Sequence, residues 1–261
     1  MQAIDLVAVS YLNTKPFLEG LYAYFPQESR ADNYQLNIHL DTPAICAQKL
    51  EQGKAQIGLI PTAQIPFVKN ATIISDFCIG ATERVKTVCL YSKQPLERIK
   101  TIYLDYQSRT SAQLLQLLAR YYWKINPKFE PAPPNFEQQL DNLDSFLIIG
   151  DRTIGLETRF EYVYDLAEHW IAFSGLPFVF AAWVSTSELS VDFLTYFNQS
   201  LSYGCSQREA VADKWNHLYP DFDLKHYYQK AISYELDGAK KAGLKLFLEL
   251  SANFHPQKNL F

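Results

Sequence analysis

Short apolar runs alternate with segments of helical periodicity over the first two thirds of the chain. Apolar runs of this length predict strands, and apolar residues three or four apart predict helices. The predicted strands are residues 4–9, 34–40, 56–60, 72–79, 85–91, 99–104, 146–149, 162–166 and 178–184, and the predicted helices are 45–50 and 110–123. Such alternation is typical of α/β proteins with mostly parallel sheets covered by helices.

Helical periodicity takes over in the last third of the chain. Helices are predicted at 191–201, 207–219, 224–236 and 239–250. Before them, the proline-rich segment 126–135 predicts a loop or an edge strand, because proline cannot donate to a strand ladder. Two strand–helix units followed by helices indicate two lobes around a cleft. We expect residues 1–92 and 183–261 to form one lobe and residues 93–182 to form the other.

Composition and charge narrow the class of protein. The 261 residues are 48% hydrophobic and carry a formal net charge of −4, so a basic surface for nucleic acid is not expected. The N-terminus does not resemble a signal peptide, and no stretch of about 18 apolar residues could span a membrane. We therefore expect a cytoplasmic protein without membrane contact. Its oligomeric state does not follow from the sequence.

The cysteines and histidines are scattered along the chain. Cys46, Cys78, Cys89 and Cys205 lie in apolar surroundings, which predicts buried free thiols. The five histidines form no ligand cluster, so no metal site is expected. The chain also lacks a G-x-S-x-G elbow, a Walker loop and a G-x-G-x-x-G fingerprint, which argues against nucleotide, nicotinamide and acyl-enzyme chemistry.

The first candidate site is the polar segment after the first predicted strand. Tyr11, Asn13 and Thr14 follow that strand's carboxyl end, where open α/β sheets tend to bind ligands. Pro16 suits the first turn of a helix, because the N–H group that it lacks would be unpaired there. The segment is therefore either one wall of a binding site or an ordinary helix start.

A second polar turn follows the strand predicted at 99–104. It contains Ser108, Arg109, Thr110 and Ser111 and opens a helix. The first N–H groups of a helix are unpaired, and with hydroxyls and a guanidinium they suit a carboxylate or a phosphate. The alternative is a helix cap with a solvated arginine.

A third polar turn, Gly150-Asp151-Arg152, follows the strand predicted at 146–149. Glycine lets the backbone approach a ligand closely. Asp151 can accept hydrogen bonds from a ligand hydroxyl or can hold Arg152, and the simpler alternative is a turn with a local ion pair. On these residues alone, the chain is a two-lobed protein that binds a small anion, as an enzyme or as a binding protein.

Five motifs follow one another along the chain: Val9-Ser10-Tyr11-Leu12-Asn13-Thr14-Lys15-Pro16, Ile57-Gly58-Leu59-Ile60-Pro61, Leu104-Asp105 with Ser108-Arg109-Thr110-Ser111, Ile149-Gly150-Asp151-Arg152, and Gly175-Leu176-Pro177-Phe178-Val179-Phe180-Ala181. Together, and in this order, they resemble the chorismate dehydratase family of the futalosine route to menaquinone. The resemblance runs over nearly the whole chain. The related family that makes dihydroxynaphthoate opens instead with a Pro-Cys-Pro-Asn-Asp-like segment.

This resemblance implies an α/β fold of the periplasmic-binding-protein-like type II class, with a ligand cleft between two lobes and no metal or organic cofactor. The implied reaction removes water from chorismate to give 3-[(1-carboxyvinyl)oxy]benzoate. Chorismate is a small dicarboxylate, and the turn at 108–111 suits one of its carboxylates. Gly150, Tyr11 and Thr14 are expected to bind the same substrate.

The resemblance also assigns catalytic residues. Asn13 matches the family's asparagine and should hydrogen-bond the substrate near its reacting ring. Thr87 stands where the family has serine, so a hydroxyl is kept while a methyl is added. Gln56 replaces the family's usual acidic residue.

The general base stays open, because the matched motifs contain no histidine or glutamate. Either the substrate's own enolpyruvyl carboxylate removes the ring proton, or Asp151 does. The competing class is a non-catalytic solute-binding protein for a small aromatic or dicarboxylate ligand on the same fold. The lack of an export signal argues against that class, since transport receptors work outside the membrane.

Overall fold

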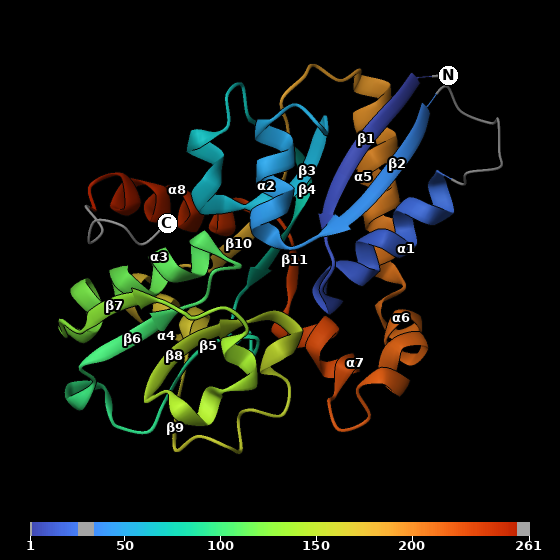
Figure 1. Cartoon of the computed structure of the whole chain (residues 1–261). Helices are drawn as coiled ribbons and strands as arrows, with labels where there is room; N and C mark the ends of the chain where they lie inside the picture. Colours follow the sequence, from blue (N-terminus) through green and yellow to red (C-terminus); the bar gives the residue numbers. More distant parts are fainter. Residues whose placement is uncertain (1, 26–33, 255–261) are drawn as a thin grey trace. The chain divides into compact units, whose positions relative to one another are not determined.

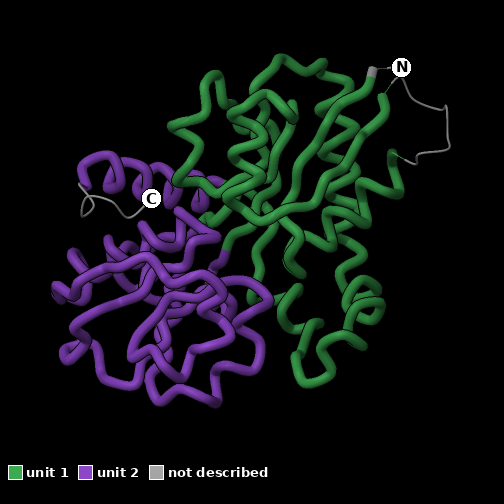
Figure 2. The backbone as a smooth tube through the Cα atoms, viewed as in Figure 1, with its two compact units in different colours: residues 1–80, 179–237 green, residues 81–178, 238–261 purple. Residues whose placement is uncertain are grey.

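The structure is a computed structural model that describes residues 2–25 and 34–254. The backbone divides into two units, and each is built from two separate parts of the chain (Figure 2). Unit 1 contains Met1–Gly80 and Val179–Asp237, and unit 2 contains Ala81–Phe178 and Gly238–Phe261. Within the described residues, every helix is too short or too polar to cross a lipid bilayer.

Unit 1 is built on a six-stranded mixed sheet (Figure 1). Parallel pairing joins β1 to β2 and to β3, so the chain's first apolar run is an interior strand of the sheet. β10 runs antiparallel to β3, and β11 runs antiparallel to β4. The order across the sheet is β11 (Ser233–Glu235), β4 (Thr72–Ala81), β10 (Phe178–Ser185), β3 (Ile57–Pro61), β1 (Gln2–Val9) and β2 (Tyr34–Asp41).

The helices of unit 1 pack closely enough to need glycine. α1 and α5 meet at Gly20 and Gly204, where an added Cβ would overlap the Ser200 carbonyl and the Pro16 carbonyl respectively. The α-helices are α1 (Lys15–Tyr24), α2 (Pro43–Glu51), α5 (Val191–Ser206), α6 (Arg208–Trp215) and α7 (Leu224–His226). Shorter turns are the 3-10 helices η1 (Leu12–Thr14), η2 (Thr62–Phe67) and η8 (Asn216–Leu218), and the π-helical turn η9 (Tyr227–Ala231).

Unit 2 is built on a five-stranded mixed sheet. β6 runs parallel to β7 and β8, whereas β5 runs antiparallel to β8 and β9. The order is β7 (Lys128–Pro131), β6 (Thr101–Leu104), β8 (Ser145–Ile149), β5 (Val88–Ser92) and β9 (Tyr162–Asp165). The proline-bearing β7 is an edge strand, as the sequence predicted. A core of buried aromatic rings includes Tyr91, Phe136 and Phe146.

The α-helices of unit 2 are α3 (Arg109–Leu117), α4 (Leu166–Ser174) and α8 (Gly238–Ala252). α3 continues into a π-helical turn, η4 (Leu118–Trp123), so the helix predicted at 110–123 is present but changes its hydrogen bonding near its end. α4 was not predicted. The remaining turns are the 3-10 helices η3 (Leu96–Arg98), η5 (Phe136–Gln138), η6 (Leu140–Asn142) and η7 (Gly150–Thr153).

The predicted lobe boundaries differ from these units. β5 falls inside the predicted first lobe, yet it pairs with β8 and β9 in the second sheet. α8 also belongs to unit 2, where Phe247 packs edge-on against Trp170 at 6.1 Å and Phe178 at 5.0 Å between ring centroids. An apolar run identifies a strand or a helix, but its partners are set by residues distant in sequence.

Two other predictions about the fold need correction. Both sheets contain antiparallel strands, so "mostly parallel" is wrong for β5, β10 and β11. The helix predicted at 224–236 is wrong beyond Ala231. Ile232 adopts an extended conformation, and Ser233–Glu235 pairs as β11 with β4, because the sheet edge supplies the backbone partners that further helical turns would have supplied.

The cysteine prediction is confirmed. All four cysteines are buried, and none forms a disulfide. Burial raises the pKa of the Cys46 and Cys205 thiols to about 12, so both are protonated at neutral pH. Buried, protonated thiols of this kind pack as small apolar side chains.

Candidate functional site

The polar segment of unit 1 forms a tight turn between β1 and α1. Tyr11 has extended backbone angles and caps η1, and the Thr14 N–H donates to the Tyr11 carbonyl at 3.1 Å. Pro16 occupies the first turn of α1, as predicted. The turn thus leaves the carboxyl end of an interior strand, the place where α/β sheets present ligand-binding groups.

The side chains of this turn are ordered by their own contacts. The Thr14 hydroxyl is fully buried and donates to Asn13 Oδ1 at 3.3 Å. Asn13 itself is half-buried. The Asn13 amide can offer a ligand its two Nδ2 hydrogens as donors and the second lone pair of Oδ1 as an acceptor.

Two buried tyrosines that the sequence reading missed hold the backbone of the same turn. The Tyr228 hydroxyl donates to the Leu12 carbonyl at 3.0 Å, and the Tyr234 hydroxyl donates to the Asn13 carbonyl at 3.0 Å. Both tyrosines lie in the segment that was predicted as one helix. No local sequence signal connects them to residues more than 200 positions earlier.

The polar turns of unit 2 lie at the carboxyl ends of two neighbouring parallel strands. β6 and β8 pair in parallel through Tyr103 and Phe146, so the turns that follow them leave the same edge of the sheet. Ser108 caps α3 with its hydroxyl, which accepts from the Ser111 N–H at 3.2 Å and lies 3.0 Å from the Ser111 hydroxyl. Thr110 is fully buried and Arg109 is half-buried.

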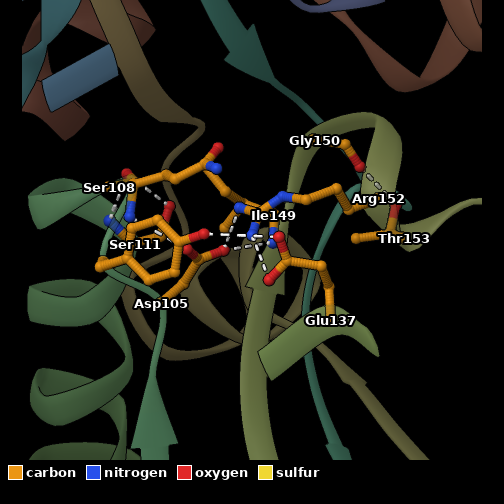
Figure 3. Close-up of polar contacts among 10 residues, drawn as sticks. Asp105, Ser108, Ser111, Glu137, Ile149, Gly150, Arg152 and Thr153 are labelled. Carbon is orange, nitrogen blue, oxygen red and sulfur yellow. Dashed lines mark hydrogen bonds and ion pairs between the residues drawn. The ribbon is translucent and has the colours of Figure 1, made fainter. Parts of the chain in front are cut away.

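One buried carboxylate ties these two turns together (Figure 3). Asp105 is fully buried, and its Oδ1 accepts from the Gln107 N–H at 3.0 Å, just before α3. Its Oδ2 accepts from the Ile149 N–H at 3.0 Å, at the end of β8, and from Arg152 Nη2 at 2.5 Å. Asp105 belongs to one of the five sequence motifs, but the sequence alone assigns it no role.

The Asp105–Arg152 pair extends into a small network. Arg152 Nη1 lies 3.9 Å from Glu137 Oε2, and Glu137 Oε1 accepts from the Tyr106 hydroxyl at 3.4 Å. Burial raises the pKa of Asp105, while the Arg152 guanidinium and two backbone N–H groups oppose that effect. Arg152 therefore forms an ion pair with Asp105, a partner 47 positions earlier in the chain.

Thr87 and Gly150 face each other just beyond the paired ends of β5 and β8. The Gly150 N–H donates to the Thr87 carbonyl at 2.8 Å, and the Thr153 hydroxyl donates to the Gly150 carbonyl at 2.8 Å. Gly150 has a φ of +67°, a conformation that suits glycine. Thr87 is 2% exposed, and its hydroxyl donates to the Val85 carbonyl at 3.4 Å. Asp151 follows in η7 and is half-buried.

The candidate residues thus form two groups. Tyr11, Asn13 and Thr14 share one turn of unit 1, and the others lie in unit 2. Gln56 lies in neither group; its Oε1 accepts from the Asp5 N–H at 2.7 Å, a structural contact that an amide makes well. In residues 2–25 and 34–254, no three or more His, Cys, Asp or Glu side chains gather in a way that could hold a metal ion.

Solved structures define the class of fold. A protein from Archaeoglobus fulgidus superposes with a TM-score of 0.72 at 13% identity, covering 96% of this chain and 97% of that one. A conserved Candida albicans protein with the generic periplasmic binding protein fold gives a TM-score of 0.67 at 9% identity, covering 100% and 93%. The aliphatic sulphonate-binding protein SsuA from Escherichia coli gives 0.63 at 12% identity, covering 99% and 95%. This chain therefore has the periplasmic-binding-protein fold.

Sequence comparison identifies the family within that class. The family model for menaquinone biosynthesis matches residues 4–253, and the chain belongs to this family. The chorismate dehydratase of Thermus thermophilus is 28% identical over 217 residues, which cover 74% of this chain and 79% of that protein. Both findings agree with the resemblance that the five motifs indicated.

Proposed function

We propose that this protein is a chorismate dehydratase, a carbon–oxygen lyase that forms 3-[(1-carboxyvinyl)oxy]benzoate for menaquinone synthesis by the futalosine route. The observation that carries the proposal is the family match over residues 4–253, together with a relative that is a chorismate dehydratase. The motifs at the candidate turns support it. They lie at strand ends, where this class of fold presents polar groups.

The reaction needs no redox partner. A ring C–H bond breaks, its electron pair becomes part of the aromatic ring, and the adjacent C–O bond breaks. The hydroxide that leaves combines with a proton, so chorismate loses one water. The elimination is redox-neutral overall, and no oxidant or reductant takes part. Aromatisation supplies the driving force, and the protein's task is to orient the ring and assist the departing hydroxyl.

The amino end of α3 is suited to one substrate carboxylate. The positive end of its helix dipole favours an anion, and Arg109 adds positive charge beside it. Ser108, Thr110 and Ser111 supply hydroxyls in the same turn. We propose that this turn, together with Gly150, Tyr11 and Thr14, binds chorismate.

Asn13 and Thr87 are the proposed catalytic residues. The Nδ2 hydrogens of Asn13 can donate to the substrate hydroxyl that departs, while the Thr14 hydroxyl holds the amide through Oδ1. The Thr87 hydroxyl can do the same work as the family's serine, with less room beside it. The proton acceptor is the substrate's enolpyruvyl carboxylate in our preferred scheme and Asp151 in the alternative.

Incubation with chorismate tests the function directly. We expect the cyclohexadiene absorbance to fall while a substituted benzoate accumulates. If Asp151→Asn abolishes turnover without weakening product binding, the substrate-assisted scheme is wrong and Asp151 is the base. A stable complex with unchanged chorismate would instead identify a solute-binding protein, the class to which SsuA belongs.

A further inference from the structure

We propose that Tyr234 is a positioning residue for Asn13, a role that rests on the dehydratase function proposed above. Its hydroxyl donates to the Asn13 carbonyl at 3.0 Å, from a residue 221 positions later in the chain. The neighbouring carbonyl, that of Leu12, accepts from Tyr228 at 3.0 Å. Two consecutive peptide groups of η1 are therefore fixed by two phenols of one segment.

Fixing this carbonyl matters because η1 is only three residues long. A single 3-10 turn has few internal hydrogen bonds, so its peptide planes are free to tilt unless an outside group holds them. The tilt of the Asn13 peptide sets the direction of the Cα–Cβ bond. It therefore sets where the Asn13 amide points, and a misplacement of about 1 Å is enough to cost most of a catalytic group's effect.

Tyr234 is itself held rigidly. It is 3% exposed, and its ring packs edge-on against Phe17 of α1 with centroids 5.1 Å apart. The Arg208 guanidinium lies 5.9 Å from the centre of the same ring. Burial raises the pKa of Tyr234 well above its usual value, so the phenol keeps its proton and remains a donor.

The break between η9 and β11 places this phenol. Pairing of β11 with β4 turns the backbone away from the helical path after Ala231. A helix continued through residue 234 would have given that side chain a different direction. The strand therefore positions the Tyr234 hydroxyl as well as completing a sheet.

The test compares Tyr234→Phe with Tyr196→Phe. Tyr196 also donates its hydroxyl to a backbone carbonyl at 3.0 Å, that of Tyr24, within the same unit but away from η1. We expect Tyr234→Phe to lower kcat for chorismate by about tenfold with KM nearly unchanged, and Tyr196→Phe to keep both within about twofold. Equal kcat values in the two variants would overturn the proposal.

Two further measurements separate this role from general loosening of the fold. In an Asn13→Ala background, Tyr234→Phe should lower kcat no further, since its effect passes through Asn13. The side-chain amide NMR signal of Asn13, identified by its loss in Asn13→Asp, should shift in Tyr234→Phe and stay in place in Tyr196→Phe. An unmoved Asn13 signal in Tyr234→Phe rejects the positioning role, whether or not the wild-type protein converts chorismate. Failure of the wild-type protein to convert chorismate refutes the dehydratase function and leaves the NMR test of the positioning role in place.

Discussion

At the scale of single residues, the candidate site depends on groups that contact backbone rather than on groups aimed at a ligand. Asp105 links the end of β8 to the start of α3, and Tyr234 holds the peptide of Asn13. Sequence reading finds residues such as Asn13 and Ser108, because polar side chains after an apolar strand are conspicuous. It gives no role to a buried aspartate or tyrosine whose partner is a distant carbonyl or N–H group.

Asp105→Asn is predicted to destabilise the protein strongly. The change removes the charge that compensates Arg152, whose side chain is only 17% exposed, and a buried pair broken on one side typically costs about 3–5 kcal/mol. Urea unfolding measures the loss. Glu137→Gln is the control, because Glu137 lies 3.9 Å from Arg152 and is 27% exposed, so its loss should cost less than about 1 kcal/mol. Equal midpoints for the two variants would contradict this account.

At the scale of elements, the polar turns of both units are held by helices and strands whose packing partners are distant in sequence. α1 begins directly after η1, so the packing of α1 against α5 helps to position Asn13. The strands and most helices could be predicted, since each produces its own local periodicity. The antiparallel partners of β5 and β10 could not be predicted, because the direction of pairing depends on the path of the chain between distant strands.

Gly204→Ala is predicted to destabilise unit 1. A Cβ there would overlap the Pro16 carbonyl, so α5 must move away from α1, at a cost of about 1–3 kcal/mol. Gly238→Ala is a matched control, since an added Cβ there meets nothing within 4 Å and should change stability by no more than about 0.5 kcal/mol. The free energy of unfolding in urea compares the two. Equal losses would mean that the close approach of α1 and α5 is not a constraint.

The contact between η4 and α4 is predicted to weaken in acid. His169 Nδ1 accepts from the Trp123 indole N–H at 3.1 Å, which requires Nδ1 to be unprotonated. Burial lowers the pKa of His169 below its usual 6.5, so the folded state binds fewer protons than the unfolded state. The contribution of neutral His169 to the free energy of unfolding should therefore be fully present above pH 6.5. It should be lost as the pH falls through the folded-state pKa of His169.

A urea series between about pH 7 and pH 5 checks this dependence on protonation. The wild-type midpoint should decline more steeply than that of His169→Gln, whose amide oxygen can accept the same bond and does not titrate in this range. Parallel declines in the two proteins would show that another group is responsible for the loss.

At the scale of the whole molecule, fold and family were predictable for different reasons. The alternation of strands and helices predicted an α/β protein of two parts, and five motifs in register indicated the family that the comparisons then showed. The membership of β5 and α8 in unit 2 was not predictable from pattern, because it depends on tertiary contacts of Val88–Ser92 and Phe247.

The central claim is that this chain removes water from chorismate. The most direct measurement is mass analysis of the product after incubation of purified wild-type protein and Asn13→Ala with chorismate at equal concentrations. We predict a product lighter than chorismate by one water with the wild-type protein, formed over many turnovers, and a rate at least tenfold lower with Asn13→Ala. Chorismate recovered unchanged from the wild-type protein, or equal product from both proteins, would contradict the account.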